Sequence, residues 1–271
     1  MLELQHVSKT FNPGTINEKQ ALIDITLTLK DGDFVTVIGG NGAGKSTMLN
    51  AVAGVWPVDT GAIRIDGENV TGLPDFKRAK LVGRVFQDPM TGTAATMQID
   101  ENLALARRRG KSRGLRWGVT AQEREEFREK LKILNLGLED RLTAKVGLLS
   151  GGQRQALTLL MATLQKPRLL LLDEHTAALD PKTAEKVLDA TERLVSEDQL
   201  TTLMVTHNMR HAIAHGNRLI MMHEGRIIYD VEGEEKKNLK VSQLLEKFEQ
   251  AAGEEFSNDR MILNSQECPQ P

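Results

Sequence analysis

Two acidic residues and a histidine follow an apolar run and are the clearest candidates for chemistry in the chain. Leu169–Leu172 has the composition of a buried strand, and Asp173, Glu174 and His175 come directly after it. Side chains of these types could ligate a metal ion, act as a general base, or cap a helix. Other segments of the sequence have to decide between these roles.

A glycine-rich loop that contains a lysine lies between a predicted strand, Phe34–Gly39, and a predicted helix that begins MLNAVAG. The loop reads GGNGAGKST and matches the phosphate-loop pattern G-x-x-x-x-G-K-[ST] in the context which that pattern requires. Backbone N–H groups would surround a phosphate chain, the lysine would reach the β and γ phosphates, and the serine hydroxyl would ligate Mg²⁺. A plain hairpin is the alternative, but strand, spacing, lysine and serine all agree with the phosphate loop. The predicted triphosphate-binding residues are Gly39, Gly40, Asn41, Gly42, Ala43, Gly44, Lys45, Ser46 and Thr47.

A bound triphosphate narrows the roles of the acidic residues. In enzymes with a phosphate loop, a second buried strand ends in an aspartate that holds the magnesium shell, and Asp173 ends such a strand. Glu174 is one residue further along, where a carboxylate can orient and polarise the attacking water. We expect His175 to be structural, because phosphate-bound Mg²⁺ prefers oxygen ligands and no cysteine or histidine stands at zinc spacing.

A second anion site is predicted in LLSGGQRQA, Leu148–Ala156, shortly before the acidic strand. Two glycines at the start of a helix cost stability, so we expect the exposed backbone N–H groups and the hydroxyl of Ser150 to bind an anion. The phosphate loop already accounts for the triphosphate of one chain. The second anion site therefore has no ligand within a monomer.

The LSGGQ segment, the phosphate loop and LLLLDE together resemble the ATP-binding cassette family, the ATPase subunits of ABC transporters, over about residues 1–230. The resemblance implies an α/β fold of the P-loop NTPase type, with a mostly parallel core sheet, an N-terminal antiparallel β subdomain and a helical subdomain at about residues 88–165. It also implies ATP and Mg²⁺ as cofactors. In this family two cassettes pack head to tail, so a homodimer or paired cassette is expected. The residues that would cover the partner's γ-phosphate are Ser150, Gly151, Gly152 and Gln153.

Four further site residues follow from the resemblance alone. Phe11 in SKTFNPG resembles the aromatic residue that stacks on adenine, with an edge-packing phenylalanine as the alternative. Gln87 in VFQDP resembles the glutamine that touches Mg²⁺ and the attacking water. Asp180 in AALD resembles the aspartate that crosses between cassettes, and His207 in VTHN resembles the switch histidine at the γ-phosphate.

The sequence departs from the family pattern at two places. The family usually has proline where His175 stands, and TLLMATLQKP lacks a common arginine. Neither position touches the phosphates, so we expect activity to survive. The expected catalytic residues are Glu174, His207 and Lys45, and the expected magnesium ligands are Ser46, Gln87 and Asp173.

The predicted elements alternate between strands and helices, which favours a parallel core sheet. Leucines and isoleucines near the N-terminus, at residues 2–4 and 22–29, alternate with polar residues and predict antiparallel strands with one wet face. A hairpin is expected to turn at Glu224 and Gly225. We expect residues 231–271 to form a charged, partly disordered extension with a short amphipathic piece at 241–248. Further predicted segments are a buried strand at Thr202–Val205 and helices at Glu123–Leu134, Ser150–Gln165 and Lys182–Ser196.

Composition excludes several classes of protein. The 271 residues include 35 basic and 37 acidic ones, for a net charge of −2, so no global charge favours nucleic acid. Cys268 is the one cysteine, and no apolar run approaches the roughly 20 residues that span a bilayer. We therefore expect a cytoplasmic chain, peripheral on the membrane through other subunits. The basic run Arg107–Trp117 is expected to be either a solvated loop or a contact for lipid headgroups or a membrane partner.

The predicted function is that of an ATP-hydrolysing subunit that drives a membrane importer of small solutes such as amino acids. DEHTAALDPKTA and NRLIMMHEGRII resemble cassettes of uptake systems for aromatic amino acids such as tryptophan or tyrosine. The implied partners are integral membrane permease subunits and, indirectly, an extracytoplasmic substrate-binding protein. The alternative is a soluble ATPase of the iron–sulfur assembly type, which usually has glutamate at the position of Gln153.

Overall fold

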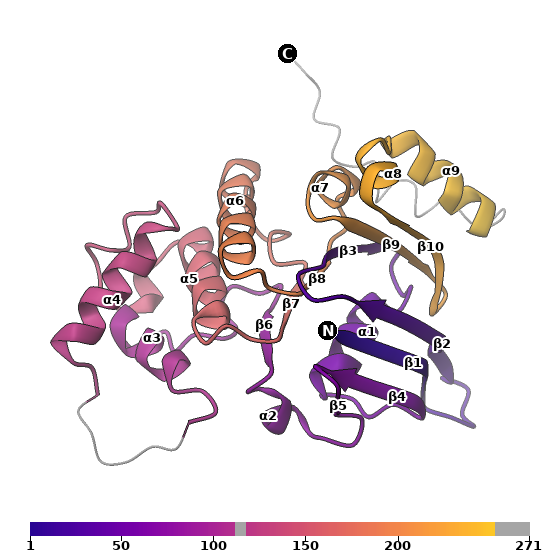
Figure 1. Cartoon of the computed structure of the whole chain (residues 1–271), viewed down its shortest axis with the longest axis horizontal. Helices are drawn as coiled ribbons and strands as arrows, with labels where there is room; N and C mark the ends of the chain where they lie inside the picture. Colours follow the sequence, from indigo (N-terminus) through magenta and orange to yellow (C-terminus); the bar gives the residue numbers. More distant parts are fainter. Residues whose placement is uncertain (112–117, 253–271) are drawn as a thin grey trace. The chain divides into compact units, whose positions relative to one another are not determined.

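The computed structural model describes residues 1–111 and 118–252, and the chain divides into two compact units. The first unit joins Met1–Pro74 to the chain from Leu203 onward, and the second unit is Asp75–Thr202. Figure 1 shows the elements of both units. The phosphate loop therefore belongs to the first unit, whereas the acidic segment and LSGGQ belong to the second.

An antiparallel sheet opens the first unit, in the order β2-β1-β4-β5. Its strands are β1 (Leu2–Phe11), β2 (Lys19–Leu29), β4 (Thr60–Ile65) and β5 (Glu68–Asn69). Buried and exposed residues alternate along the second half of β2, as the period of two in the sequence predicts. The predicted antiparallel β subdomain is confirmed.

The phosphate loop follows a strand that is buried along its whole length. This strand, β3 (Phe34–Gly39), pairs in parallel with β9 (Arg218–His223), and β9 pairs antiparallel with β10 (Arg226–Glu232). On its other side β3 neighbours β8 (Thr202–Val205). Strands β9 and β10 turn at Glu224 and Gly225, which both have positive φ, as the predicted hairpin requires.

Four helices complete the described part of the first unit: α1 (Lys45–Ala53), α7 (Met209–Ala214), α8 (Gly233–Lys237) and α9 (Val241–Ala252). Leu244 and Phe248 of α9 are fully buried in a core with residues of α7, β9 and β10. The chain after Val231 is therefore folded to Ala252, whereas the sequence pattern predicts structure only at 241–248. Residues 253–271, including Cys268, lie outside the described residues.

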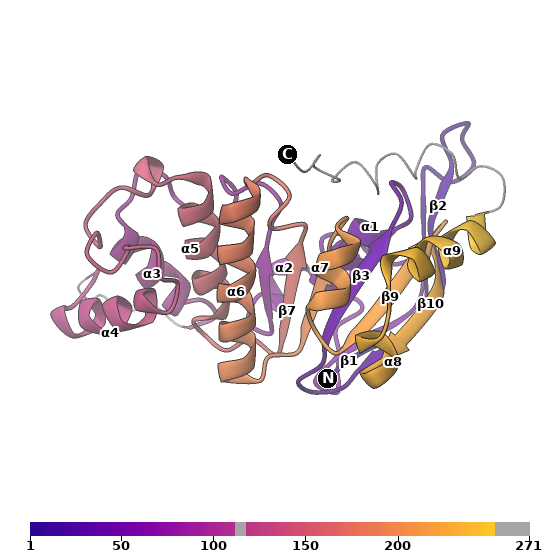
Figure 2. The same ribbon diagram turned by 90° about the horizontal axis from the view of Figure 1, so that it is seen from above.

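Two parallel strands and several helices form the second unit. Strands β6 (Val82–Val85) and β7 (Leu169–Asp173) pair in parallel. Figure 2 shows α5 and α6 side by side. No helix within residues 1–111 and 118–252 is long and apolar enough to cross a membrane. The helical segments of the second unit are α2 (Asp75–Arg78), α3 (Ile99–Arg107), α4 (Ala121–Lys132), η1 (Val146–Leu148), α5 (Gly151–Thr163) and α6 (Pro181–Asp198).

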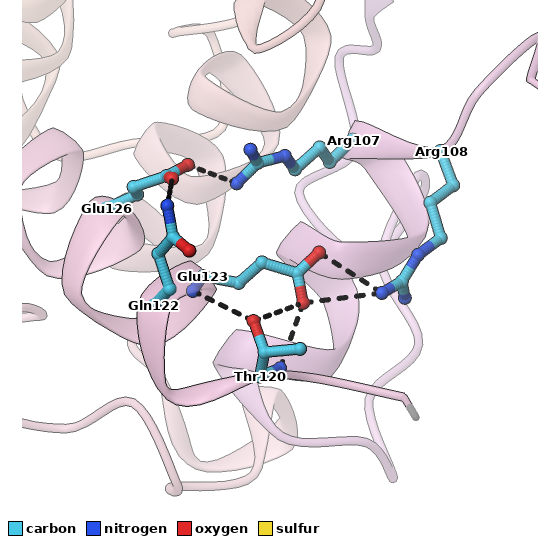
Figure 3. Close-up of polar contacts among 6 residues, drawn as sticks. All are labelled: Arg107, Arg108, Thr120, Gln122, Glu123 and Glu126. Carbon is cyan, nitrogen blue, oxygen red and sulfur yellow. Dashed lines mark hydrogen bonds and ion pairs between the residues drawn. The ribbon is translucent and has the colours of Figure 1, made fainter. Parts of the chain in front are cut away.

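The start of the basic run is held by acidic residues of α4 (Figure 3). Arg107 forms an ion pair with Glu126. The Nη2 of Arg108 lies 3.2 Å from Oε1 of Glu123, whose carboxylate also accepts a hydrogen bond from the backbone N–H of Thr120. These two arginines are therefore bound inside the second unit.

Arg109 is bound inside the same unit through a different contact. Its Nη2 donates to the carbonyl oxygen of Ala162, at 3.1 Å. These first three arginines are partly buried and each donates to a protein group, so they do not form a fully solvated loop. The contact with lipid headgroups or a membrane partner stays a prediction. The expectation for residues 112–117 lies outside the described residues.

Candidate functional site

The phosphate loop has a backbone that side chains would obstruct. Gly39 has φ of 154°, and a Cβ there would lie 2.2 Å from the carbonyl oxygen of Met222. Gly44 has φ of 101°, and its Cβ would lie 2.5 Å from the carbonyl oxygen of Ala21. Glycine is thus required at both positions, by conformation and by the close approach of neighbouring backbone.

Lys45 lies inside the curve of this loop. Its side chain is only 5% exposed, and Nζ donates to the carbonyl oxygens of Gly39 and Gly40 at 2.8 and 2.9 Å. Ser46 follows within the first turn of α1, whose N-terminus the loop leads into. An ammonium group and the N–H groups of a helix N-terminus are therefore gathered at one place, where an anion is stabilised.

The hairpin and β2 hold the loop from outside. The N–H of Gly225 donates to the carbonyl of Ala43 at 3.0 Å, and the carbonyl of Gly225 accepts from the N–H of Ile23 at 2.8 Å. Nζ of Lys19, at the start of β2, lies 3.0 Å from the position that a Cβ on Gly42 would take. Lys19 thus adds a second cation at the loop, which no motif in the sequence indicates.

Phe11 ends β1 opposite Lys19 of β2. Its ring packs against Trp56 in an edge-on arrangement, with centroids 4.9 Å apart, and Nζ of Lys9 lies 5.7 Å from the centroid of Phe11. The Phe11 ring therefore packs within the protein, against Trp56. This contact leaves the adenine-stacking role as a prediction.

His207 lies between β8 and α7. The N–H of Thr206 donates to the carbonyl of Val37 at 3.1 Å, so the segment that leads to His207 is held against the strand that leads to the phosphate loop. Asn208 then caps α7, because its side-chain oxygen accepts from the N–H groups of Arg210 and His211. The histidine position is therefore defined by a strand on one side and a helix cap on the other.

Asp173 ends β7 in the second unit, beside a cation. Nη2 of Arg84 lies 3.3 Å from Oδ2 of Asp173, and both side chains are 14% exposed. Glu174 follows with φ of 47°, a left-handed conformation that is uncommon for a residue with a side chain. The chain thus leaves the strand sharply at Glu174.

The side chain of His175 packs toward α6. Its side chain is buried, at 2% exposure, and Nε2 lies 3.2 Å from the hydroxyl oxygen of Thr191. The Thr191 hydroxyl donates to the carbonyl of Val187 at 2.8 Å, so the imidazole Nε2–H is the donor to Thr191. The structure places His175 in a packing role between the acidic segment and α6.

Gln87 follows β6, next to a buried glutamine of α5. Nε2 of Gln155 donates to the carbonyl of Phe86 at 2.8 Å. This hydrogen bond connects the segment of Gln87 to the helix that begins with LSGGQ. No motif indicates Gln155, because nothing in the sequence pairs residues 86 and 155.

Ser150 caps α5 through a reciprocal pair of hydrogen bonds. Its hydroxyl oxygen accepts from the N–H of Gln153 at 3.3 Å, and its own N–H donates to Oε1 of Gln153 at 3.2 Å. A Cβ on Gly152 would lie 1.9 Å from Cγ2 of Thr183 in α6, whereas one on Gly151 would meet its nearest neighbour, Leu179, at 3.6 Å. The sequence pattern predicts that both glycines serve anion binding, but helix packing already requires Gly152.

Asp180 caps α6. Its Oδ1 accepts from the N–H of Thr183 at 3.1 Å, and hydrogen bonding to Thr183 lowers the pKa of the Asp180 carboxyl.

The predicted site residues are divided between the two units. The first unit carries Phe11, the phosphate loop and His207, and the second unit carries the remaining predicted residues. Those of the second unit are Gln87, Ser150, Gly151, Gly152, Gln153, Asp173, Glu174 and Asp180.

Comparison with known proteins gives several similarities. The profile of a family described as ABC transporter matches residues 22–177. A tyrosine transport ATP-binding protein of Clostridioides difficile is 45% identical over 93% of this chain and 100% of its own length. The spermidine/putrescine import ATP-binding protein PotA of Haemophilus influenzae is 33% identical over 85% of this chain, but the match spans only 57% of that protein.

Solved structures agree with these sequence matches. The dimeric structure of a post-hydrolysis state of the ATP-binding cassette MJ0796, bound to ADP and Pi, superposes with a TM-score of 0.73 at 32% identity. The match covers 86% of this chain and 98% of that one. The cassette MJ1267 in its ADP conformation gives a TM-score of 0.74 at 24% identity, over 92% of this chain and 98% of that one, and so supports the fold.

Proposed function

Because the chain belongs to the ABC transporter family, we propose that it is the ATPase subunit of a bacterial importer for an aromatic amino acid such as tyrosine. ATP binding and hydrolysis are the activity of the family. The observation that carries the choice of cargo is the similarity to the tyrosine transport protein, which spans that protein's full length. The cassette does not bind the cargo, so this choice depends on the relative alone.

The iron–sulfur assembly alternative is not supported. The similar proteins include subunits named for the transport of tyrosine and the import of polyamines, phosphonates and methionine. Import subunits act with membrane proteins. We therefore propose integral membrane permease subunits as partners, with an extracytoplasmic substrate-binding protein on the far side, and a place for this chain on the cytoplasmic face.

The phosphate loop supplies the binding energy for the triphosphate. Backbone N–H groups from Gly39 to Thr47 and the ammonium of Lys45 would hold the phosphates, with α1 adding its dipole. Nζ of Lys45 now donates to loop carbonyls, and phosphate oxygens would take over these hydrogen bonds. Phe11 would stack on the adenine, and Lys19 provides a further cation near Gly42.

The donors assigned to Mg²⁺ fit that ion. Ser46 offers a hydroxyl oxygen, Gln87 an amide oxygen and Asp173 a carboxylate, and Mg²⁺ prefers oxygen ligands. The Asp173 carboxylate already pairs with a cation, because its Oδ2 lies 3.3 Å from Nη2 of Arg84. Mg²⁺ held by these oxygens would supply positive charge that offsets the negative charge of the triphosphate.

Glu174 is the proposed general base. Its left-handed backbone turns the chain out of β7 just after Asp173, so Asp173 is the last residue of the strand and Glu174 begins the loop. The Glu174 carboxylate would accept a proton from the attacking water, and His207 would hydrogen-bond the γ-phosphate. Lys45 stabilises the charge on the transferred phosphoryl group.

A complete site is proposed to need two chains. The start of α5 presents backbone N–H groups and the Ser150 hydroxyl, and a helix N-terminus stabilises an anion. These groups would close on the γ-phosphate held by a second chain, with Asp180 at the same interface. A relative that is 32% identical, MJ0796, was solved as a dimer, which supports this arrangement.

Complementation of uptake tests the proposal. In a bacterium that lacks this gene but keeps its permease, we expect the wild-type chain to restore uptake of labelled tyrosine. Glu174→Gln should restore none and should accumulate as an ATP-bound dimer, because water is no longer activated. Glu185→Gln, which removes an exposed carboxylate of α6, is the matched control and should behave as wild type. ATP hydrolysis by Glu174→Gln at the wild-type rate would contradict the assignment of the base.

A further inference from the structure

Arg84 is the charged neighbour of the proposed metal ligand Asp173, and no motif or family pattern in the sequence assigns it a role. It lies on β6, and Asp173 ends the adjacent parallel strand β7. Nη2 of Arg84 lies 3.3 Å from Oδ2 of Asp173. Both side chains are 14% exposed, so water screens this pair less than it screens an ion pair on the surface.

The strand register explains why arginine suits this position. Arg84 stands opposite Leu171, two residues before Asp173 on β7. A short side chain would therefore not reach the carboxylate, since two residues of a strand span about 6.6 Å. The long side chain of arginine crosses that distance and presents its guanidinium to the oxygen.

An aromatic ring keeps the guanidinium in place. Cζ of Arg84 lies 4.5 Å from the centroid of the Phe86 ring, which is two residues further along the same chain. A cation over an aromatic face is stabilised by the charge distribution of the ring. The guanidinium of Arg84 therefore stays beside the site when its carboxylate partner is drawn toward another cation.

A carboxylate oxygen that pairs with a guanidinium is less available to a metal ion. Mg²⁺ binds proteins through oxygen ligands such as carboxylates, and the guanidinium of Arg84 lies 3.3 Å from one oxygen of this carboxylate. Mg²⁺ bound to Asp173 therefore competes with Arg84 for the negative charge of one carboxylate and lies close to a second cation. Repulsion between the two cations raises the Mg²⁺ concentration that the site needs.

We propose that Arg84 is a positioning residue that holds the carboxylate of Asp173 and competes with Mg²⁺ for it. This inference rests on the proposed magnesium role of Asp173. Arg84 thereby sets the Mg²⁺ concentration at which the nucleotide site becomes loaded.

A Mg²⁺ titration of the full chain tests the inference. The protein is held in excess over a fluorescent, non-hydrolysable ATP analogue, and the midpoint for added MgCl₂ is measured. Arg84→Met removes the charge, keeps the apolar stem and should lower the midpoint about five-fold, which corresponds to about 1 kcal/mol for one partly exposed ion pair. Arg84→Lys keeps the charge and should stay closer to wild type. The matched control is Arg128→Met, which removes a cation paired with Glu125 elsewhere in the second unit and should leave the midpoint unchanged.

An unchanged or higher midpoint for Arg84→Met would overturn the inference. Should that variant fail to fold by circular dichroism, Arg84→Gln is titrated in its place, with the same expected fall. Asp173→Asn tests the magnesium role of Asp173 separately from the role of Arg84. If it leaves the midpoint unchanged, the magnesium role of Asp173 fails; if it raises the midpoint while Arg84→Met has no effect, only the role of Arg84 fails. In the Asp173→Asn background, Arg84→Met should no longer lower the Mg²⁺ midpoint, because the carboxylate that pairs with Arg84 is gone.

Discussion

The imidazole of His175 lies one residue from the proposed base, yet it is buried against Thr191 of α6. Histidine next to two carboxylates could equally have been a metal ligand from its residue type alone. What separates the two roles is the direction of the side chain, which the sequence does not contain. The structure turns the imidazole toward a hydroxyl group whose own proton is donated to Val187.

Replacing His175 with proline should therefore leave ATP hydrolysis within a few-fold of wild type, as measured by phosphate release. The fold should lose about 1–3 kcal/mol, because a buried hydrogen bond and the packing of a ring disappear together. Thr191→Val, which removes the other partner of that bond, is the control and should lower the melting temperature without changing the rate. A loss of hydrolysis by orders of magnitude in a folded His175→Pro protein would instead favour the metal-ligand role.

Asp59 provides a second prediction for a single residue, through pH. Its Oδ1 lies 2.8 Å from Nζ of Lys9, and its Oδ2 accepts from the N–H of Thr10 at 2.6 Å. The hydrogen bond from Lys9, followed by that from Thr10, lowers the pKa of the Asp59 carboxyl below 3.8. A carboxyl with a lower pKa in the folded state stabilises the fold above its unfolded pKa, and this stability is lost as pH falls through the folded pKa.

Asp59→Asn should thus lower the free energy of unfolding at neutral pH by about 0.5 kcal/mol, a small value because the Asp59 side chain is 42% exposed and water screens the pair. The difference from wild type should be constant at neutral pH and should shrink as pH falls below 3.8. Urea denaturation of both proteins across this range measures it. A difference that grows toward acid pH would show that another group titrates.

At the scale of elements, local patterns predict much of what the structure contains. The glycine spacing of the phosphate loop and the pair Glu224 and Gly225 predict their turns, because few residues tolerate positive φ. Helices α4, α5 and α6 begin and end within about two residues of the predicted bounds. Helix termini vary by this much between definitions.

The C-terminal elements were only partly predictable. The charged composition of residues 233–240 is typical of a disordered segment. However, Lys236 is 1% exposed, and its Nζ donates to the carbonyls of Ile213 and Gly216 at the end of α7. A cation at a helix C-terminus is stabilised by the unpaired carbonyls there. That partner lies about 20 residues earlier in the chain, and no local pattern reveals it. Arg84, Lys19 and Gln155 were missed for the same reason.

The packing of α5 on α6 gives the prediction at this scale. Gly152→Ala should destabilise the protein by about 1–3 kcal/mol, because the new methyl group would lie 1.9 Å from Cγ2 of Thr183. Adding Thr183→Ser removes that methyl group and should recover much of the loss, whereas Gly151→Ala has its nearest neighbour at 3.6 Å and should cost less. Denaturant titrations of the wild type and of these three variants check this. If Gly152→Ala is as stable as wild type, the glycine is retained for its anion-binding backbone alone.

At the scale of the whole molecule, one chain carries a phosphate loop and an LSGGQ helix start, and the proposed mechanism needs one of each from different chains. The Ser150 hydroxyl is already used as a helix cap, accepting from the N–H of Gln153 at 3.3 Å, and its second lone pair and its proton remain for a phosphate. The cap also fixes the N-terminal turn of α5 before any partner arrives. Pairing of two chains would thus require little rearrangement at this end of the helix.

Ser150→Arg separates binding by the monomer from hydrolysis by the pair. The variant should bind ATP with unchanged affinity, because its own phosphate loop is intact, and should lose nearly all hydrolysis, because the arginine obstructs the partner's site. Loss of the cap should cost about 1 kcal/mol, so Ser150→Thr, which keeps a hydroxyl oxygen at the same position, is the matched control and should retain activity. Nucleotide binding is measured by fluorescence titration and hydrolysis by phosphate release over a range of protein concentrations. Wild-type hydrolysis should rise more than in proportion to protein concentration while dimers form, and a specific rate that is independent of concentration in a monomeric protein would contradict the two-chain site.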